Sequence, residues 1–375
     1  MTRPIRARID RDAFRHNLAL ARQAAAGARC WAVVKADAYG HGLLPMAQAI
    51  AATADGFALI EIEGAVALRE AGLRHPILLL EGFYDAAELP LLAQYDLTPV
   101  LHAPWQVEAL ASAELPFAIP VVLKIETGMH RLGLRRNELT AALGRLAACG
   151  CASSITLMTH FANADGEPGI ADQIAAFDAA ASGRHLPRSL GNSAALLRYG
   201  ERVGGEGNWA RPGIMLYGAS PCPEIASAKS YGLRPVMTLE SGLIAVRKLA
   251  AGDRVGYGGS FVARAPMTVG VVACGYGDGY PRHAPTGTPV LVDGRRTWLV
   301  GRVSMDKLCV NLTDFANYSD GGTAHAAPPG GRVVLWGTDA ASGAVLPADE
   351  VATAAGTIAY ELFCALAGRV PIDYI

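Results

Sequence analysis

The sequence predicts an α/β protein in which a TIM-like (β/α)8 barrel is followed by a mostly-β C-terminal domain. Short apolar, β-branched segments alternate with Ala- and Leu-rich helical patterns over about the first 220 residues, which is typical of parallel βα units. Eight such strand segments occur, and eight is the number that closes a TIM barrel. The pattern then changes to strands and turns, so we expect the barrel over residues 1–232 and a β-strand domain over 233–375.

The predicted barrel strands are apolar segments that end in polar residues. They cover 30–35, 56–61, 76–81, 97–102, 119–126, 155–161, 188–192 and 211–216. Helices are expected at 12–26, 45–53, 62–71, 85–94, 104–113, 136–148 and 170–181. An open doubly wound sheet would show the same local alternation, and the strand count favours the barrel.

The second domain is predicted from strand and turn signals. Its strands are expected at 236–249, 254–262, 267–274, 289–292, 297–303, 307–312 and 332–336. The Asp293-Gly294 pair between two of them predicts a type I′ hairpin. One helix is expected at 347–359, and the Gly-, Ala- and Pro-rich segment 316–331 is expected to be a mobile surface loop.

The composition excludes several classes of protein. The 375 residues are 51% hydrophobic and carry a formal net charge of -1. Proteins that bind nucleic acid usually carry an excess of basic residues, so nucleic acid is not an expected partner. No apolar segment is long enough to span a bilayer and no signal-peptide pattern is present, which predicts a cytoplasmic protein. The seven cysteines form no CxxC motif, so we expect neither a disulfide scaffold nor a metal site.

The carboxyl ends of parallel barrel strands meet on one rim, where barrel enzymes hold their active sites. Residues that the sequence places there are Lys35, Glu61, Glu81, His102, Lys124, His160, Asn192, Ser193, Arg211 and Gly213. Any one of them could be a polar residue where a strand meets solvent. Lys, His, Ser and Arg on a single rim favour catalysis.

Lys35 is the most informative of these candidates, because it follows the apolar segment 31–34. A lysine at the end of a buried strand is partly desolvated, which favours its neutral amine. A neutral amine can attack a carbonyl carbon and form a Schiff base. The alternative is a lysine whose stem packs on the rim while its ammonium reaches water.

Ser193 and Gly213 predict an anion site on the same rim. Ser193 lies where a strand gives way to a helix, and a hydroxyl beside free helix N–H groups can hold a phosphate. A plain helix cap is the alternative for this serine. Gly213 allows a second backbone contact, because glycine lets a chain approach closely. A Schiff-base lysine beside a phosphate cradle indicates a pyridoxal phosphate (PLP) enzyme or a class I aldolase.

The chain resembles the PLP-dependent alanine racemases nearly from end to end. The matching segments are 32–42, 124–133, 159–162, 192–194, 211–218, 255–258, 275–282 and 301–306. The family's architecture, a TIM-like barrel followed by a β domain, agrees with the fold expected from the residue pattern.

The resemblance implies two acid/base groups, Lys35 and Tyr257. Racemisation needs one group to remove the Cα proton and another to return a proton from the opposite face. Tyr257 would come from the partner subunit of a homodimer. A tyrosine hydroxyl ordinarily has a pKa of about 10, so a base of this kind needs positive charge nearby, which His160 and Arg211 provide in the family.

The resemblance also implies the remaining contacts. Cofactor contacts would be Lys35, Tyr39, His160, Asn192, Ser193, Arg211, Gly213, Ile214 and Tyr360, with Arg211 facing the pyridine nitrogen. A guanidinium does not give up its proton, so it would weaken the ring as an electron sink and limit transamination. Arg131, Tyr276 and Met305 would bind the substrate, Lys124 would be carbamylated, and Asp165, Arg282 and Arg302 would ring the entrance.

The implied activity is reversible interconversion of L- and D-alanine, either supplying D-alanine for peptidoglycan or acting in D-alanine catabolism. Non-catalytic PLP carriers share the barrel but lack the β domain. PLP decarboxylases with this barrel have a different counter-base, and a racemase of broader specificity is a further alternative. Glu126 departs from the family, which usually has Asp at this position.

Overall fold

The computed structural model describes residues 3–315 and 331–375, so the expected loop over 316–331 lies outside the described part except for its last residue. The chain forms two compact units. We call Phe14–Ala38 with Gly42–Leu233 the barrel unit, and Met1–Ala13, Tyr39–His41 and Arg234–Ile375 the β unit.

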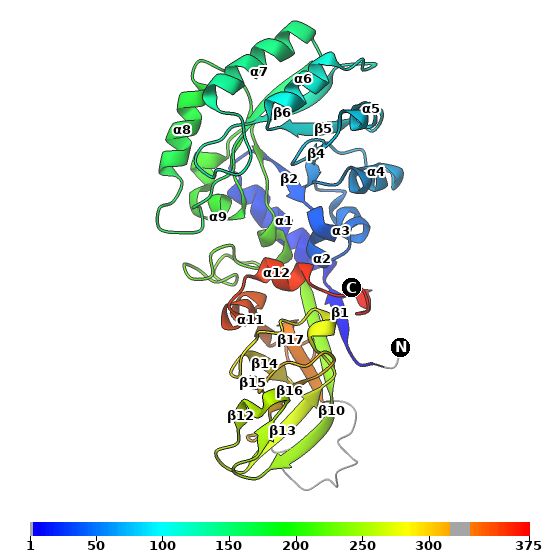
Figure 1. Cartoon of the computed structure of the whole chain (residues 1–375), viewed down its shortest axis with the longest axis vertical. Helices are drawn as coiled ribbons and strands as arrows, with labels where there is room; N and C mark the ends of the chain where they lie inside the picture. Colours follow the sequence, from blue (N-terminus) through cyan, green and yellow to red (C-terminus); the bar gives the residue numbers. More distant parts are fainter. Residues whose placement is uncertain (1–2, 316–330) are drawn as a thin grey trace. The chain divides into compact units, whose positions relative to one another are not determined.

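The barrel unit contains eight parallel strands that close in sequence order (Figure 1). These strands are β2 Arg29–Val33, β3 Gly56–Leu59, β4 Ile77–Leu79, β5 Leu97–Leu101, β6 Ile119–Lys124, β7 Ala152–Met158, β8 Arg188–Ser189 and β9 Trp209–Ala210. Pairing of β2 with β9 closes the barrel, and there Trp31 stacks on Trp209 with ring centroids 3.9 Å apart. The predicted barrel is confirmed.

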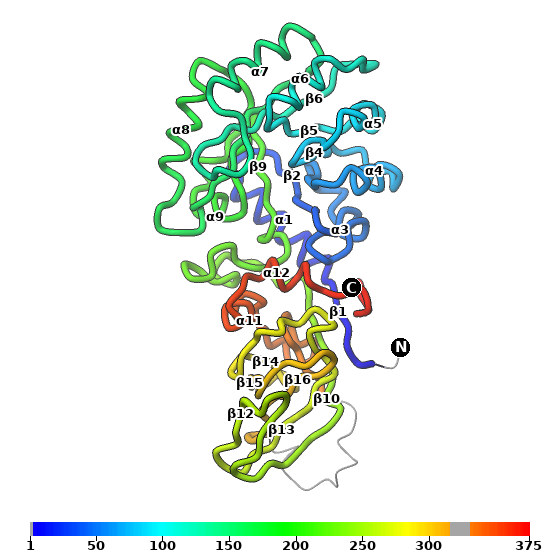
Figure 2. Tube along the Cα trace, viewed as in Figure 1, coloured from blue at the N-terminus to red at the C-terminus, as the bar shows by residue number. Residues whose placement is uncertain are grey.

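Helices alternate with these strands, as Figure 2 shows along the trace from blue to green. They are α1 Arg11–Ala24, α2 Lys35–Gly40, α3 Leu43–Ile50, α4 Ile62–Glu70, η1 Ala86–Glu88, α5 Leu89–Gln94, α6 Pro104–Ser112, α7 Arg136–Cys149, α8 Ala171–Ala181 and α9 Ser193–Val203. The sequence did not predict α2, which follows β2 almost directly.

The eighth strand was predicted at 211–216 and is wrong in position. Strand β9 ends at Ala210, and Ile214–Tyr217 form the 3-10 helix η2. Pro212 has no N–H to give to a ladder, and Gly218 ends η2 in a left-handed conformation, with φ 81°. Arg211 therefore lies directly after a strand.

The β unit is built on one sheet whose order is β18-β17-β14-β15-β16-β13-β10-β1-β19. Its strands are β1 Arg6–Ile9, β10 Met237–Leu249, β13 Met267–Val272, β14 Pro289–Val292, β15 Arg295–Val300, β16 Leu308–Asn311, β17 Arg332–Thr338, β18 Val345–Leu346 and β19 Ile372–Tyr374. Strand β10 also pairs with β17, so six strands from β10 to β17 form a ring. Because β1 pairs with β10, this strand belongs to the β unit although it lies near the start of the sequence.

Local predictions in the β unit have mixed outcomes. Asp293 and Gly294 have φ of 46° and 77°, as a type I′ turn requires. The helix expected at 347–359 is two helices, α11 Ala348–Ala355 and α12 Ala359–Cys364, because Gly356 ends the first with φ 72°. The strand expected at 254–262 is β11 Arg254–Val255 and β12 Phe261–Val262, with the 3-10 helix η3 Tyr257–Gly259 between them.

One disulfide is present, between Cys149 and Cys151. It encloses a single residue, so it joins the end of α7 to the residue before β7 and ties no distant segments together.

Among the described residues, none of the helices combines the length and the apolar character needed to cross a bilayer.

Candidate active site

The closed barrel brings the predicted rim residues to one end. Lys35 begins α2 after β2, Lys124 ends β6, and Arg211 directly follows β9. His160 and Asn192 come two and three residues after β7 and β8. Since all eight strands are parallel, their carboxyl ends share one rim.

Helix α2 holds Lys35 in an unusual backbone. The four residues Ala36, Asp37, Ala38 and Tyr39 have φ between 51° and 52°, so α2 is wound in the left-handed sense. L-residues in this conformation cost about 1–2 kcal/mol each. Asp37 partly offsets that cost, because its carboxylate accepts a hydrogen bond from the Leu43 amide at 2.7 Å.

Arg211 is a buried cation held by neutral oxygens. Its Nη1 donates to Ser189 O and Oγ, and its Nη2 donates to Thr159 O at 2.6 Å. None of the ion pairs found within 3–315 and 331–375 involves Arg211. Burial lowers the pKa of Arg211 to about 10, so it remains a cation at neutral pH.

His160 lies amid the positive charge of this rim. Burial lowers the pKa of His160 well below its ordinary value, and the nearby charges of Arg211, Lys124, Arg131 and Lys35 lower it further. The imidazole is therefore neutral at neutral pH. Gln173 on α8 donates to His160 O at 3.2 Å and so fixes the segment that carries the ring.

Lys124 is 7% exposed and takes part in none of the side-chain hydrogen bonds or ion pairs of the described chain. Burial lowers the pKa of Lys124 to about 8, with further contributions from the charges of Arg211 and Arg131. With this pKa the ammonium still predominates at pH 7, but the neutral amine, which is nucleophilic, is far more abundant than for an ordinary lysine.

The loop after β6 folds back tightly and carries Arg131. The Leu134 amide donates to Lys124 O at 2.7 Å, and the Glu126 amide donates to Leu134 O at 3.0 Å. The Glu126 carboxylate accepts a hydrogen bond from the Met129 amide at 2.8 Å. The glutamate that departs from the family pattern thus binds the backbone of its own loop.

The start of α9 and the segment after β9 lie where an anion site was predicted. Asn192 caps α9, because its side-chain oxygen accepts from the Ala195 amide at 2.9 Å. Ser193 Oγ lies 2.9 Å from the Gly213 amide nitrogen and 3.4 Å from that of Met215. In both contacts the amide donates to the hydroxyl. The Ser193 O–H, the Ile214 N–H and the N–H groups at the helix start suit a phosphate.

The β unit holds the other predicted residues. Tyr257 is 72% exposed on the η3 turn, where Gly256 and Gly258 both have φ of 71°. Arg254 stabilises this turn by donating to Gly259 O at 3.0 Å. The rings of Tyr39 and Tyr360 are 5.8 Å apart, and burial raises the pKa of Tyr39.

Tyr276 and Met305 lie on adjoining loops of the β unit. The Tyr276 amide donates to Ser304 O at 3.0 Å, and the Gly277 amide donates to Met305 O at 2.8 Å. Both side chains are substantially exposed, at 40% and 54%. These loops can therefore present a phenol and a thioether together to a small ligand.

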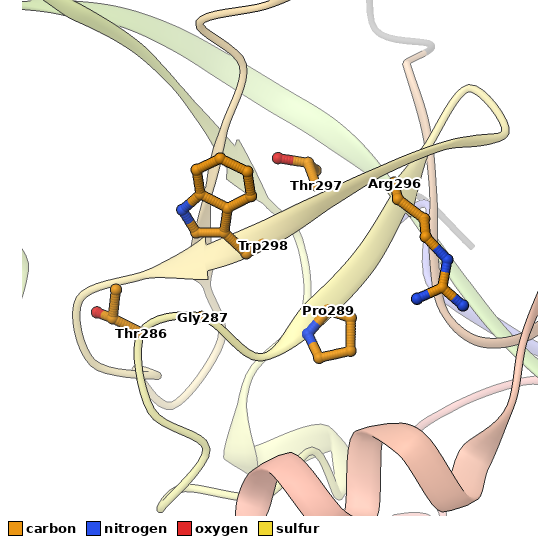
Figure 3. Close-up of a pocket in the computed structure, with 6 residues that line it drawn as sticks. All are labelled: Thr286, Gly287, Pro289, Arg296, Thr297 and Trp298. Atoms are coloured by element: carbon orange, nitrogen blue, oxygen red, sulfur yellow. The ribbon is translucent and has the colours of Figure 1, made fainter.

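A separate hollow of about 470 Å³ lies on the β unit beside the β14–β15 hairpin (Figure 3). Its lining residues are Thr286, Gly287, Pro289, Arg296, Thr297 and Trp298. No residue predicted to act is among these six. Arg296 points toward α11, where it pairs with Glu350.

Sequence reasoning missed the residues that hold the predicted ones in place. Ser189, Thr159 and Gln173 bind Arg211 or the His160 segment. Ser189 lies on a predicted strand and could have been noticed there. The contacts of Gln173 depend on how α8 packs, which no local motif encodes.

This architecture defines the class: a barrel enzyme whose carboxyl-end rim combines a lysine after β2, a buried arginine without a carboxylate partner among the described residues, and an anion cradle at α9. Residues 9–221 match the family model for the alanine racemase N-terminal domain, and residues 236–374 match the model for its C-terminal domain. The chain belongs to the alanine racemase family.

Individual relatives agree over the whole length. The chain is 52% identical to the alanine racemase of Nitrosospira multiformis, with 99% of each chain covered. It matches the crystal structure of the biosynthetic alanine racemase from Pseudomonas aeruginosa with a TM-score of 0.92, 42% identity and full coverage of both chains. The alanine racemase of Bartonella henselae with covalently bound pyridoxal phosphate matches with a TM-score of 0.84 and 29% identity over 99% of each chain.

Proposed function

We propose that this protein interconverts L- and D-alanine with pyridoxal phosphate, using Lys35 and Tyr257 as its two acid/base groups. The barrel rim carries the proposal. It combines Lys35, the cation Arg211 and the Ser193–Gly213 cradle on one end of a barrel whose family is alanine racemase. The Bartonella henselae relative, which holds the cofactor covalently, supports the same cofactor here.

The residues present fit the cofactor. Ser193 Oγ and the Ile214 amide would hold its phosphate, together with Tyr39 and Tyr360, and the Gly213 amide donates to Ser193 Oγ. Asn192 caps the helix whose first N–H groups would face that phosphate. Lys35 Nζ would bind its carbonyl carbon, and Arg211 would face its ring nitrogen.

When bound, pyridoxal phosphate withdraws electrons from the amino acid and acidifies its Cα–H. Lys35 Nζ then removes or returns the Cα proton on one face, and Tyr257 Oη does the same on the other. Arg211 keeps its proton while it binds Ser189 and Thr159, so it can donate a hydrogen bond to the ring nitrogen without protonating it. Because His160 is neutral, the positive charge that Tyr257 needs as a base would come from Arg211 and its neighbours rather than from His160.

Substrate binding would involve Arg131, Tyr276 and Met305. The Arg131 guanidinium would bind the alanine carboxylate, helped by the Met305 amide. Tyr276 would limit the space beside the Cα substituent, which favours a methyl group. Asp165, Arg282 and Arg302 would ring the entrance.

We propose a division of labour between the two parts of the sequence, in which residues 1–232 form the cofactor-binding barrel and residues 233–375 contribute the second catalytic base, Tyr257. In a homodimer with shared sites, Tyr257 would act at the barrel of the partner subunit. We also propose a cytoplasmic location, which cell fractionation would test.

We further propose that Lys124 is carbamylated. Its neutral amine would attack carbon dioxide, so that an N–C bond forms, one proton leaves to solvent and a carbamate anion results. That anion would neutralise part of the charge that lowers the Lys124 pKa and would position Arg131. A carbamate signal in ¹³C NMR after addition of ¹³C-bicarbonate, absent in Lys124→Met, is expected.

One experiment tests the activity. The purified protein is incubated with L-alanine, L-serine or L-lysine in deuterium oxide, and D-enantiomer and Cα deuterium are measured. We expect both with alanine, together with a visible absorption band that Lys35→Ala abolishes. A protein without the band, or without deuterium in alanine, would contradict the proposal.

A second experiment tests the shared site. Lys35→Ala and Tyr257→Phe variants, each nearly inactive, are mixed under conditions that exchange subunits. Random pairing makes half of the dimers mixed, and each mixed dimer holds one intact site, so about a quarter of wild-type activity should return. No recovery after confirmed exchange would mean that each site is built within one chain.

A further inference from the structure

Two loops of the β unit, 275–279 and 304–306, carry Tyr276 and Met305 and are in direct backbone contact. Besides the two amide hydrogen bonds described above, a Cβ added at Gly275 would lie 2.2 Å from Ser304 O. No side chain fits between the loops at this position. A shift of one loop therefore moves the other, so the positions of Tyr276 and Met305 depend on each other.

Asp278 anchors the first loop, 275–279, from the interior of the β unit. Its side chain is fully buried, and both nitrogens Nη1 and Nη2 of Arg3 donate to it at 2.8 and 2.9 Å. Arg369 Nε and the Gly275 amide donate to the same carboxylate at 2.7 and 3.0 Å. Burial alone would raise the pKa of Asp278, but these hydrogen bonds hold it below its ordinary value. The carboxylate is thus ionised, and four donors fill its acceptor sites.

Arg369 connects this anchor to the second loop. Its Nε donates to Asp278 Oδ1, and its Nη2 donates to Asp306 Oδ1, each at 2.7 Å. Asp306 is the residue after Met305. One planar guanidinium therefore ties together the loops of Tyr276 and Met305, with a geometry that a lysine ammonium does not reproduce.

We propose that Arg369 is a positioning residue that sets the affinity for the substrate by fixing Tyr276 and Met305 through Asp278 and Asp306. This inference rests on the proposed function, in which those two residues contact the alanine side of the site. Without the bridge, the loops can move relative to each other, and the Met305 amide is no longer held at the position of the substrate carboxylate. Loss of such a ground-state contact raises KM and leaves kcat nearly unchanged.

The first test is kinetic. Arg369→Leu and Asp306→Asn are each expected to raise KM about tenfold for both enantiomers, with kcat within about twofold of wild type. Arg369→Lys should restore only part of the affinity. Combining Arg369→Leu with Asp306→Asn should add little to either change, because both variants break the same bridge. The two enantiomers have equal free energies, so the equilibrium constant is 1 and kcat/KM must be the same for L- and D-alanine in every variant. This equality checks the kinetic data.

The matched control is Arg332→Leu. Arg332 also pairs with a fully buried aspartate of the β unit, Asp339, outside the two loops. We expect Arg332→Leu to lower the melting temperature of the protein and to leave KM for alanine unchanged.

The second test needs no activity. The protein has eight methionines, so ¹³C-methyl labelling gives a small spectrum in which Met305→Leu assigns the Met305 signal. Arg369→Leu and Asp306→Asn should shift or broaden this signal, while Arg332→Leu should not. A Met305 signal and a KM that stay at wild-type values in both variants would overturn the inference, as would equal changes in Arg332→Leu. A wild-type protein that fails to racemise alanine would instead overturn the proposed function, and the methyl spectrum would still decide the positioning role.

Discussion

Arg211 donates from a single nitrogen, Nη1, to both oxygens of Ser189, at 2.7 Å to the carbonyl and 2.6 Å to the hydroxyl. With Thr159 O on Nη2, the guanidinium is oriented by uncharged groups alone. A carboxylate at this position would fix the arginine equally well but would cancel its charge. The arrangement keeps a full positive charge inside the barrel rim, where it acts on His160 and Lys124.

Ser189→Ala is expected to destabilise the protein by about 2 kcal/mol, because a buried charged donor loses one acceptor. In the holoenzyme, the less firmly held Arg211 should also allow more transamination, seen as pyridoxamine phosphate formed per racemisation event. Urea unfolding and product analysis measure the two effects. Ser241→Ala is the control, since Ser241 Oγ donates to Ala273 O at 2.9 Å in the β unit. It should cost about 1 kcal/mol without side reaction, and equal side reaction in both variants would contradict the prediction.

Ala36→Gly is expected to stabilise the protein, although the same change in an ordinary helix destabilises it. Ala36 is exposed and has φ 52°, so glycine relieves a left-handed penalty of about 1–2 kcal/mol. The greater freedom of glycine in the unfolded chain offsets about half of that gain. Ala147→Gly on the exposed face of α7 should instead lose about 1 kcal/mol. Chemical unfolding of both variants checks the opposite signs, and two losses of equal size would refute the role of the backbone.

The same segment shows where sequence reasoning succeeds and where it stops. A continuous apolar segment predicts β2, which is buried except at Arg29. Helical periodicity predicts α3 to α8, because each of these helices buries one face. It does not predict α2, since Ala36 and Ala38 give no local signal for a left-handed turn. The eighth strand was misplaced because 214–216 is as apolar as a strand, and the 3-10 turn depends on Pro212 and Gly218 at its two ends.

The site was predicted unevenly for a similar reason. Lys35, Ser193 and Arg211 could be named because strand ends on a barrel converge by geometry alone. Asp278 stands in a quoted motif but received no role, because its partners Arg3 and Arg369 lie 275 and 91 residues away in the chain. Pairings at such separations follow from the closed sheet of the β unit and from no short pattern.

Asn192→Ala is expected to weaken both the fold and the cofactor site. The Asn192 side chain caps α9 at 2.9 Å, and loss of such a cap costs about 1 kcal/mol. Because the same helix start faces the expected phosphate, the dissociation constant for pyridoxal phosphate should rise as well. Asp85→Ala removes a comparable cap from η1, where Asp85 accepts from the Ala87 amide at 2.8 Å, and it should leave cofactor affinity unchanged. Titration of both apo variants with pyridoxal phosphate, followed by absorbance, decides the matter.

Lys124→Met is expected to stabilise the apo protein at pH 7 and to lose that advantage as the pH rises. The folded protein holds the Lys124 pKa at about 8, below the ordinary value of about 10.4 in the unfolded chain. Between these values the unfolded chain binds more protons than the folded one, so the wild-type free energy of unfolding rises with pH across this window. Methionine removes the buried ammonium and should raise the free energy of unfolding by on the order of 3 kcal/mol at pH 7, with a smaller difference at pH 9.5.

Urea unfolding at both pH values measures this difference between Lys124→Met and wild type. The buffer must be free of carbon dioxide, because a carbamate would mask the amine. Lys229→Met, at an exposed lysine, should change the free energy of unfolding equally at the two pH values. If Lys124→Met also changed the free energy of unfolding by the same amount at pH 7 and pH 9.5, the buried amine would not be the source of the stability difference.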